Sequence, residues 1–272
     1  MSGSKKHRLE LLLLVVGGCI GLVVVVAWCR KGDASWPAKL CRKHKDMLDR
    51  VCEGPVAVKE RKIVPMSKAK LTKFRFHDRK MILSIPKEWD DVSVSLTGKV
   101  SILLISGKSE KWSASMIMDP QREQFCGEFL STYNHMLRSL NDPAAAKKLE
   151  GSFMTFLTGS DEEIFRRCLL QTKKILATAG SDKEKLVAAF LGLTLRADLL
   201  WGKVDKCELV TLKRNRVYIG PSPNYPKTHV KMWIFDGDGL FLGELIVSSK
   251  KLTTGLQIAD SVERMKRPKK KE

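Results

Sequence analysis

Residues 106–109, Ser-Gly-Lys-Ser, contain the Gly-Lys-Ser group of a phosphate-binding loop. In that motif a glycine stands five residues before the Gly-Lys pair, and the helix that follows helps to hold the phosphate. Ile102 stands where the first glycine belongs, and the residues after Ser109 continue in the pattern of a strand. We therefore predict a turn between strands at this position.

Residues 236–239, Asp-Gly-Asp-Gly, bring two carboxylates close together, as a calcium-binding loop does. Such a loop ends on a bidentate glutamate, but Val247 and Ser248 stand at the required spacing. An Asp-Gly pair between apolar runs is also a strong signal for a tight hairpin turn. We predict a hairpin tip here.

Two further groups offer metal-ligating or nucleophilic side chains. A zinc site could be assembled from Cys41, His44, Cys52 and the distant His77. However, the spacing of these residues matches no paired-ligand pattern, and the segment is basic, which disfavours a divalent cation. A Ser-x-x-Lys pair at 67–70 is expected by chance in so lysine-rich a segment. HExxH, GxSxG and GxGxxG groups are absent from the sequence. The sequence therefore predicts no catalytic residue, no metal ligand and no cofactor, and it favours a protein that is not an enzyme.

A proline-rich segment surrounds Tyr225, with prolines at positions 221, 223 and 226. Exposed loops of this kind often carry binding residues, although most of them are plain connections between strands. Both interpretations stay open at this point.

Residues 11–29 form an uncharged run rich in leucine and valine. At 1.5 Å per helical residue the run spans roughly 28 Å, about the thickness of a bilayer's hydrocarbon core. Trp28 lies at its end, where an aromatic ring suits the membrane interface. We predict a single transmembrane signal-anchor helix. A cleaved signal peptide, a lipoprotein site at Cys19 and a buried core helix are the weaker alternatives.

Gly17 and Gly21 form one GxxxG pair within this run. Small residues at that spacing let two membrane helices approach closely, so a homodimer through these glycines is one possibility.

The formal charge of +19 is concentrated beside the predicted anchor and in the C-terminal tail. A basic segment next to a membrane is attracted to anionic headgroups. The residues expected to make this contact are Arg30, Lys31, Lys39, Arg42, Lys43 and Lys45. Because the rest of the domain is nearly neutral, we do not expect nucleic acid to be the main partner.

Six basic residues follow the anchor closely and three precede it, which favours a cytoplasmic location for the large domain over an exported one. The seven cysteines show no paired spacing. We expect free thiols at Cys126, Cys168 and Cys207, as in a reducing compartment.

Apolar periodicity predicts an antiparallel β-meander, then a block of helices, then a second antiparallel β-meander and a C-terminal helix. The first strands are expected at 81–85, 92–96, 100–105 and 112–118. Asp-Pro pairs and Ser-x-x-Glu capping boxes predict helices at 120–140, 144–157, 164–176 and 186–201. The later strands are expected at 208–212, 216–219, 229–235 and 240–247, before a helix at 253–265. The fold class is therefore α+β.

Leu186, Phe190 and Leu193 share one stripe of the helix expected at 186–201. This helix has a short uncharged stretch, so we predict a buried core helix and not a second membrane span.

Several short motifs resemble those of the PsbP-like α/β-sandwich family. They are Ile85, Pro86, Trp89 and Asp91 at the end of a strand, a glycine-turn hairpin at 232–247, and Ser261-Val262-Glu263 near the end of the last helix. The resemblance covers about residues 75–265, and the helical block at 120–201 departs from the family pattern. It implies a non-enzymatic binding or assembly module behind a signal or anchor segment.

The predicted organisation has five parts: a short basic N-terminal tail at 1–10, the transmembrane helix at 11–29, a basic juxtamembrane linker at 30–75, a soluble α+β domain at 76–265 and a basic disordered tail at 266–272. The function expected is a membrane-anchored, non-enzymatic binding or scaffold module with an unknown protein partner. One alternative is a tethered enzyme whose site forms no motif. Another is a tethered binder of nucleic acid or anionic lipid through residues 30–80 and the tail.

Overall fold

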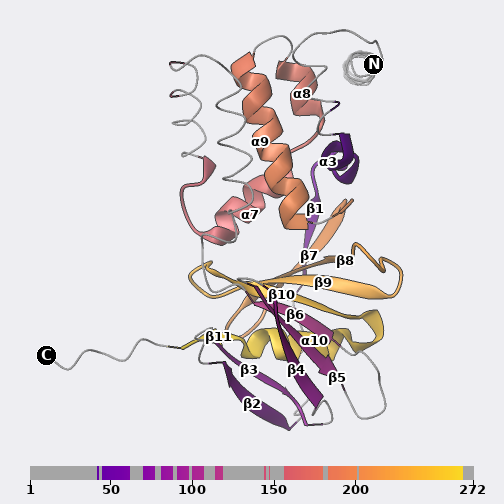
Figure 1. The fold of residues 1–272 in the computed structure, drawn as a ribbon, viewed down its shortest axis with the longest axis vertical. Coiled ribbons are helices and arrows are strands. Elements are labelled where there is room, and N and C mark those ends of the chain that lie inside the picture. Colours follow the sequence, from indigo (N-terminus) through magenta and orange to yellow (C-terminus); the bar gives the residue numbers. More distant parts are fainter. Residues whose placement is uncertain are drawn as a thin grey trace, which may run out of the picture. The chain divides into compact units, whose positions relative to one another are not determined.

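The computed structural model describes residues 42, 45–61, 70–76, 81–87, 91–97, 100–106, 114–118, 144, 147, 156–179, 183–200 and 202–265. The chain divides into two compact units. The first comprises Met1–Pro55, Phe129–Leu157 and Arg167–Lys203, and the second comprises Val56–Glu128, Thr158–Arg166 and Val204–Glu272. Among the described residues, both sheets belong to the second unit (Figure 1).

The second unit contains an eight-stranded sheet in the order β1-β7-β8-β9-β10-β6-β5-β4. Its strands are β1 (Ala57–Arg61), β4 (Asp91–Thr97), β5 (Val100–Ser106), β6 (Ala114–Met118), β7 (Lys206–Thr211), β8 (Arg216–Pro221), β9 (His229–Phe235) and β10 (Phe241–Ser248). Neighbouring strands are antiparallel except β1 and β7, which run parallel. The two predicted meanders, β4–β6 and β7–β10, are therefore joined into one sheet through the pairing of β6 with β10.

A smaller antiparallel sheet in the same unit has the order β11-β3-β2. It consists of β2 (Leu71–Phe76), β3 (Met81–Pro86) and β11 (Glu263–Arg264). Helix α10 (Leu252–Ser261) immediately precedes β11, after a short 3₁₀ turn η2 (Ser249–Lys251).

One hydrophobic core joins the two sheets and α10. It contains buried side chains from β3, β6, β7, β8, β9, β10 and α10, with Leu83, Met232 and Ile258 fully buried among them. Gly255 lets α10 lie close to the large sheet, because a Cβ at that position would be 2.8 Å from both Met232 Cε and Val247 Cγ1. Burial of this apolar surface is the main source of stability for the unit.

The opposite face of the large sheet carries a cluster of aromatic rings. Phe165, from helix α7 (Asp161–Leu170), has its ring centroid 5.0 Å from that of Tyr218, 5.5 Å from Trp233 and 5.3 Å from Phe235. Because β9 is covered on both faces, its sequence is a nearly continuous apolar run and not a strict alternation.

The described helices of the first unit are α3 (Lys45–Arg50), the end of α7, α8 (Lys174–Ala179) and α9 (Lys183–Leu200). Both α3 and α8 pack against α9. Leu186, Phe190 and Leu193 are buried as predicted. The buried guanidinium of Arg196 donates to the backbone carbonyls of Gly54, at 3.1 Å, and Gln171, so one side chain connects three segments of this unit.

The α+β class and most expected strands are confirmed, but three features differ from the predictions. β1 and all but the last residue of β2 lie within the segment 30–75, where no strand was expected. β1 is exposed at every position and therefore lacks the alternation that signals a strand. β3 was expected to continue into the first meander, but it pairs with β2 and β11 in the small sheet.

The helix expected at 164–176 is interrupted. α7 ends at Leu170 and α8 begins at Lys174. The carbonyl of Gln171 accepts from Arg196, and the N–H of Ile175 donates to Thr172 instead. The carbonyl that a continuous helix would pair with Ile175 is thus bonded to a buried arginine.

The anchor expected at 11–29 and the tail at 266–272 lie outside the described residues. Within the part of the chain that the structure describes, no helix has both the length and the apolarity needed to cross a bilayer.

Candidate functional site

Two of the six residues expected to contact the membrane surface are described. Arg42 is helical and exposed, and Lys45 is exposed at the start of α3. The other four, Arg30, Lys31, Lys39 and Lys43, lie outside the described residues, as do Gly17 and Gly21. Their proposed contact with lipid and the glycine-mediated dimer stay predictions.

The Asp-Gly-Asp-Gly segment is the tip of the β9–β10 hairpin, as predicted. One carboxylate oxygen of Asp236 accepts from the backbone N–H groups of Asp238, at 3.0 Å, and Leu240, at 2.8 Å. Gly239 has φ 78°, a left-handed conformation that glycine adopts without strain. The Asp236 side chain fixes the turn.

Most of the remaining sequence motifs fall on residues that are not described: Cys41, His44, Ser67, His77, Gly107, Lys108 and Ser109. Within the described ranges, no group of three or more His, Cys, Asp or Glu side chains could hold a metal ion. Cys168 and Cys207 are buried thiols, as expected, whereas Cys126 is outside the described residues.

A first polar cluster lies at the N-terminus of α7. The predicted capping box is present, since the Ser160 N–H donates to Glu163 Oε2 at 2.9 Å and the Glu163 N–H donates to Ser160 Oγ at 3.3 Å. This places Asp161 and Glu162 in the first turn, where the helix dipole favours acidic side chains. Asp161 Oδ2 then accepts from the Phe241 N–H at 2.9 Å, so the helix start is bonded to β10.

Glu162 connects the same helix to β8. Its carboxylate pairs with the Arg216 guanidinium at 2.6 Å and accepts from the Tyr218 hydroxyl at 3.0 Å. Glu162 is buried and Tyr218 is fully buried. Burial, and next the adjacent Glu162 carboxylate, raise the pKa of Tyr218 well above its usual value. The phenol is therefore held neutral as a hydrogen-bond donor.

A second polar cluster is the ion pair between Lys231 on β9 and Glu244 on β10. Lys231 Nζ lies 2.8 Å from Glu244 Oε2, and the two side chains are only 2% and 13% exposed. The ammonium also lies 5.0 Å from the ring centroid of Trp233, within reach of a cation–π interaction. A Cβ at Gly220, which pairs with Lys231, would be 3.1 Å from the Trp233 ring, so glycine makes room for the indole.

Burial changes the pKa of both members of this pair. It lowers the pKa of Lys231 and raises that of Glu244, while the partner charge opposes each shift. Sequence analysis did not find the pair. The available signal was one lysine and one glutamate in two otherwise apolar strands that a tight turn connects.

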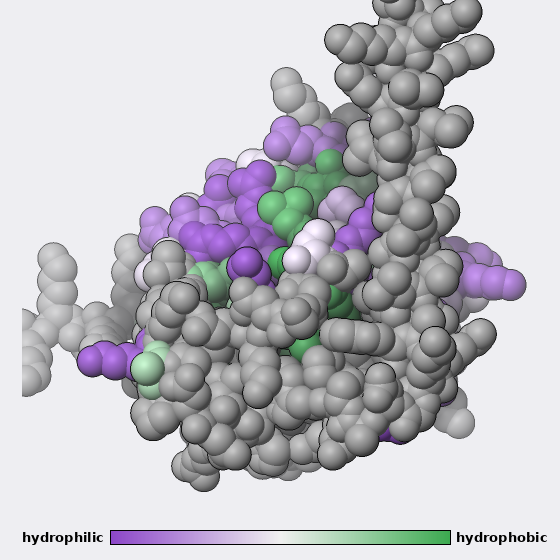
Figure 2. Space-filling view, turned by 90° about the horizontal axis from the view of Figure 1, so that it is seen from above, coloured by the Kyte–Doolittle hydropathy of each residue, from purple (hydrophilic) through white to green (hydrophobic). Residues whose placement is uncertain are grey.

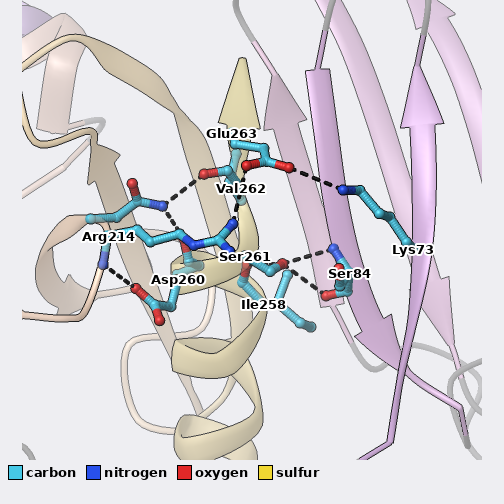
Figure 3. Close-up of polar contacts among 10 residues, drawn as sticks. Lys73, Ser84, Arg214, Ile258, Asp260, Ser261, Val262 and Glu263 are labelled. Carbon is cyan, nitrogen blue, oxygen red and sulfur yellow. Dashed lines mark hydrogen bonds and ion pairs between the residues drawn. The ribbon is translucent and has the colours of Figure 1, made fainter. Parts of the chain in front are cut away.

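A third polar cluster surrounds the C-terminus of α10 (Figure 3). The buried Asn215 amide donates to the carbonyls of Ala259 at 2.7 Å and Val262 at 2.8 Å. The Ala259 carbonyl also accepts from the Val262 N–H at 3.4 Å. Ser261 Oγ accepts from the Ser84 N–H on β3 at 2.7 Å. These bonds hold the last turn of α10 to the small sheet and to the β7–β8 turn.

Ion pairs continue this cluster to the surface, as Figure 3 shows. Glu263 pairs with Lys73 at 3.2 Å and with Arg214 at 3.0 Å. The Arg214 N–H also donates to Asp260 at 2.8 Å. Lys73 and Arg214 are therefore both matched by acidic side chains.

The β8–β9 loop presents Tyr225 to solvent. Tyr225 is 63% exposed, although its ring lies 5.4 Å from the His229 ring between centroids. The Tyr225 carbonyl accepts from the N–H groups of His229, at 2.9 Å, and Thr228, at 3.2 Å. The Ser222 N–H donates to the His229 carbonyl at 3.0 Å, so hydrogen bonds close the loop at its base and within it.

The end of β10 lies beside this loop, because the Ser249 N–H donates to the Thr228 carbonyl at 2.8 Å. Lys227 and Lys250 are exposed and Lys251 is partly exposed. Neither residues 221–229 nor residues 248–254 contain an aspartate or glutamate. We call Tyr225, Lys227, His229, Lys250 and Lys251 the Tyr225 surface.

Exposed large apolar side chains are few elsewhere in the described ranges. Leu170, at 65%, is as exposed as Tyr225, and Val58, Leu71 and Ile175 are less exposed. In Figure 2 the coloured residues are mostly hydrophilic, with a smaller hydrophobic group among them.

Comparison of the chain with protein-family models, with curated proteins and with solved structures gave no match.

Proposed function

We propose that this protein is a membrane-tethered, non-enzymatic binding module. The apolar run at 11–29 and the basic residues after it support the tether. The resemblance to the PsbP-like family is part of the same proposal, because it implies a binding or assembly role behind an anchor.

The buried polar groups of the second unit support a scaffold role. Lys231 bonds to Glu244, and Glu162 bonds to Arg216 and Tyr218. Each of these buried charges has a partner on a neighbouring element. A buried ion pair is satisfied only when its two elements are correctly arranged, so these pairs favour one arrangement of strands and helix. Such pairs give the sheet a defined shape from which its loops project.

The single observation that carries the binding role is the exposed ring of Tyr225. Its loop is held in one conformation by backbone hydrogen bonds. Tyrosine is enriched at protein interfaces because it offers a large ring and a hydroxyl with few rotatable bonds. A loop that is already fixed loses less conformational entropy when a partner binds.

Site-specific photo-crosslinking in intact cells tests this proposal. Tyr225 is replaced by p-benzoylphenylalanine in the full chain, and Lys213, exposed in the β7–β8 turn at the other end of β8, is replaced in the same way as a control. We expect a specific adduct from position 225, seen by mass spectrometry, and none from position 213. Equal labelling at both positions, or none at 225, would contradict the binding role.

A further inference from the structure

We propose that the Tyr225 surface docks on the anionic phospholipid headgroups of the membrane that holds the chain. This inference rests on the proposed tether and names the partner of the Tyr225 surface. It is carried by three features of the described residues: the unmatched positive charge, the exposed aromatic ring and the hydrogen bond that joins the two segments.

The charge of this surface differs from that of the β7–β8 and β9–β10 turns at the other end of β8 and β9. The β9–β10 turn carries Asp236 and Asp238, and Arg214 in the β7–β8 turn is matched by Glu263. No described residue forms an ion pair with Lys227 or Lys250, and both are exposed. Two unmatched lysines on adjacent segments complement a negatively charged surface.

The ring of Tyr225 adds the second component of a headgroup site. Tyrosine is enriched where membranes meet water, because its ring lies among apolar groups while its hydroxyl stays hydrated. The Ser249–Thr228 hydrogen bond keeps this ring and both lysines on adjacent segments. The residues therefore present one combined surface and not two separate loops.

A bilayer is a better partner for this surface than an acidic protein is, because the anchor already holds the chain beside the bilayer. Tethering converts docking into an intramolecular event with a high effective concentration, so weak contacts are sufficient. Each lysine near an anionic surface strengthens attraction about fivefold at low salt, so Lys227 and Lys250 together give roughly 25-fold.

The test uses the full chain reconstituted in nanodiscs of phosphatidylcholine alone or phosphatidylcholine with phosphatidylserine. Hydrogen exchange is measured at residues 221–229 and 248–251. We expect slower exchange at both segments with phosphatidylserine, and no difference at high salt, where the attraction is screened. The Lys227→Glu/Lys250→Glu variant should lose the protection, and the control Lys213→Glu should keep it.

Identical exchange in both kinds of nanodisc would overturn the inference. So would protection that persists in the Lys227→Glu/Lys250→Glu variant. A photo-adduct at position 225 to an acidic protein and not to lipid would also overturn it, while supporting a binding role. A chain that fails to enter nanodiscs would instead contradict the tether itself, so the two failures are distinguishable.

Discussion

Lys231 and Glu244 are held together inside the large sheet with little access to water. Lys231→Met alone should be strongly destabilising, because it leaves the Glu244 carboxylate buried without its cation. The free energy of unfolding should fall by about 3–5 kcal/mol. The double variant Lys231→Met/Glu244→Leu should be much closer to wild type, since apolar side chains replace the whole pair.

Denaturant unfolding of the detergent-solubilised full chain, followed by circular dichroism, measures both variants. If the double variant were as unstable as the single one, the loss would come from altered packing and not from an unpaired buried charge.

Tyr218 makes a prediction about alkaline pH. Tyr218→Phe removes a hydrogen bond to a buried carboxylate and should cost about 1.5–3 kcal/mol near neutral pH. The pKa of Tyr218 is raised in the folded state, so the stability that it contributes is complete below the unfolded pKa of about 10 and is lost as pH rises above it. The cost of Tyr218→Phe should therefore shrink above that pH.

Unfolding of wild type and Tyr218→Phe at matched pH values tests the direction of this pH dependence. Titratable groups shared by the two proteins cancel in the difference between their free energies of unfolding. A cost that grows with pH would show that the neutral phenol is not the stabilising form.

Several of these residue-scale features could not be predicted from the sequence. The turn at 236–239 was predictable because an Asp-Gly pair acts through its own backbone. The pair of Lys231 with Glu244 depends on strand register, and Glu162 meets Tyr218 only after α7 packs on the sheet. Contacts of that kind leave no local pattern.

At the scale of elements, the end of α10 depends on one side chain from another segment. Asn215→Ala should lower the free energy of unfolding by about 1–3 kcal/mol, because two hydrogen bonds from the buried Asn215 amide to the carbonyls of Ala259 and Val262 are lost. Asn215→Asp should cost more, since a carboxylate would face those carbonyls. Thermal unfolding of the full chain measures both, with the exposed Asn224→Ala as a control near zero. Equal effects at positions 215 and 224 would contradict the capping role.

Elements with strong apolar periodicity were predictable, and those without it were not. β7–β10 and α10 were found within a few residues of their observed bounds. β1 is exposed throughout, and β2 has only Phe74 packed against the core, so neither shows a clear apolar face. The parallel pairing of β1 with β7 joins residues about 150 positions apart, which local pattern cannot reveal.

For the whole molecule, we predict that the α+β part lies on the cytoplasmic side of the membrane. The basic residues after position 29 outnumber those before position 11, and retaining them inside avoids moving charge against the membrane potential. Protease added outside intact spheroplasts should leave residues 30–272 undigested. Digestion there, with a cytoplasmic control protein intact, would reverse the orientation.

Fractionation of cells that express the full chain or a chain without residues 1–29 tests the membrane tether. The hydrophobic attraction of a transmembrane helix is not screened by salt, whereas that of lysine for lipid is. We predict that the full chain stays in the membrane fraction at high salt and leaves it only with detergent. The shortened chain should appear folded in the soluble fraction. Release of the full chain by salt alone, or retention of the shortened chain in the membranes at high salt, would contradict a single hydrophobic anchor at 11–29.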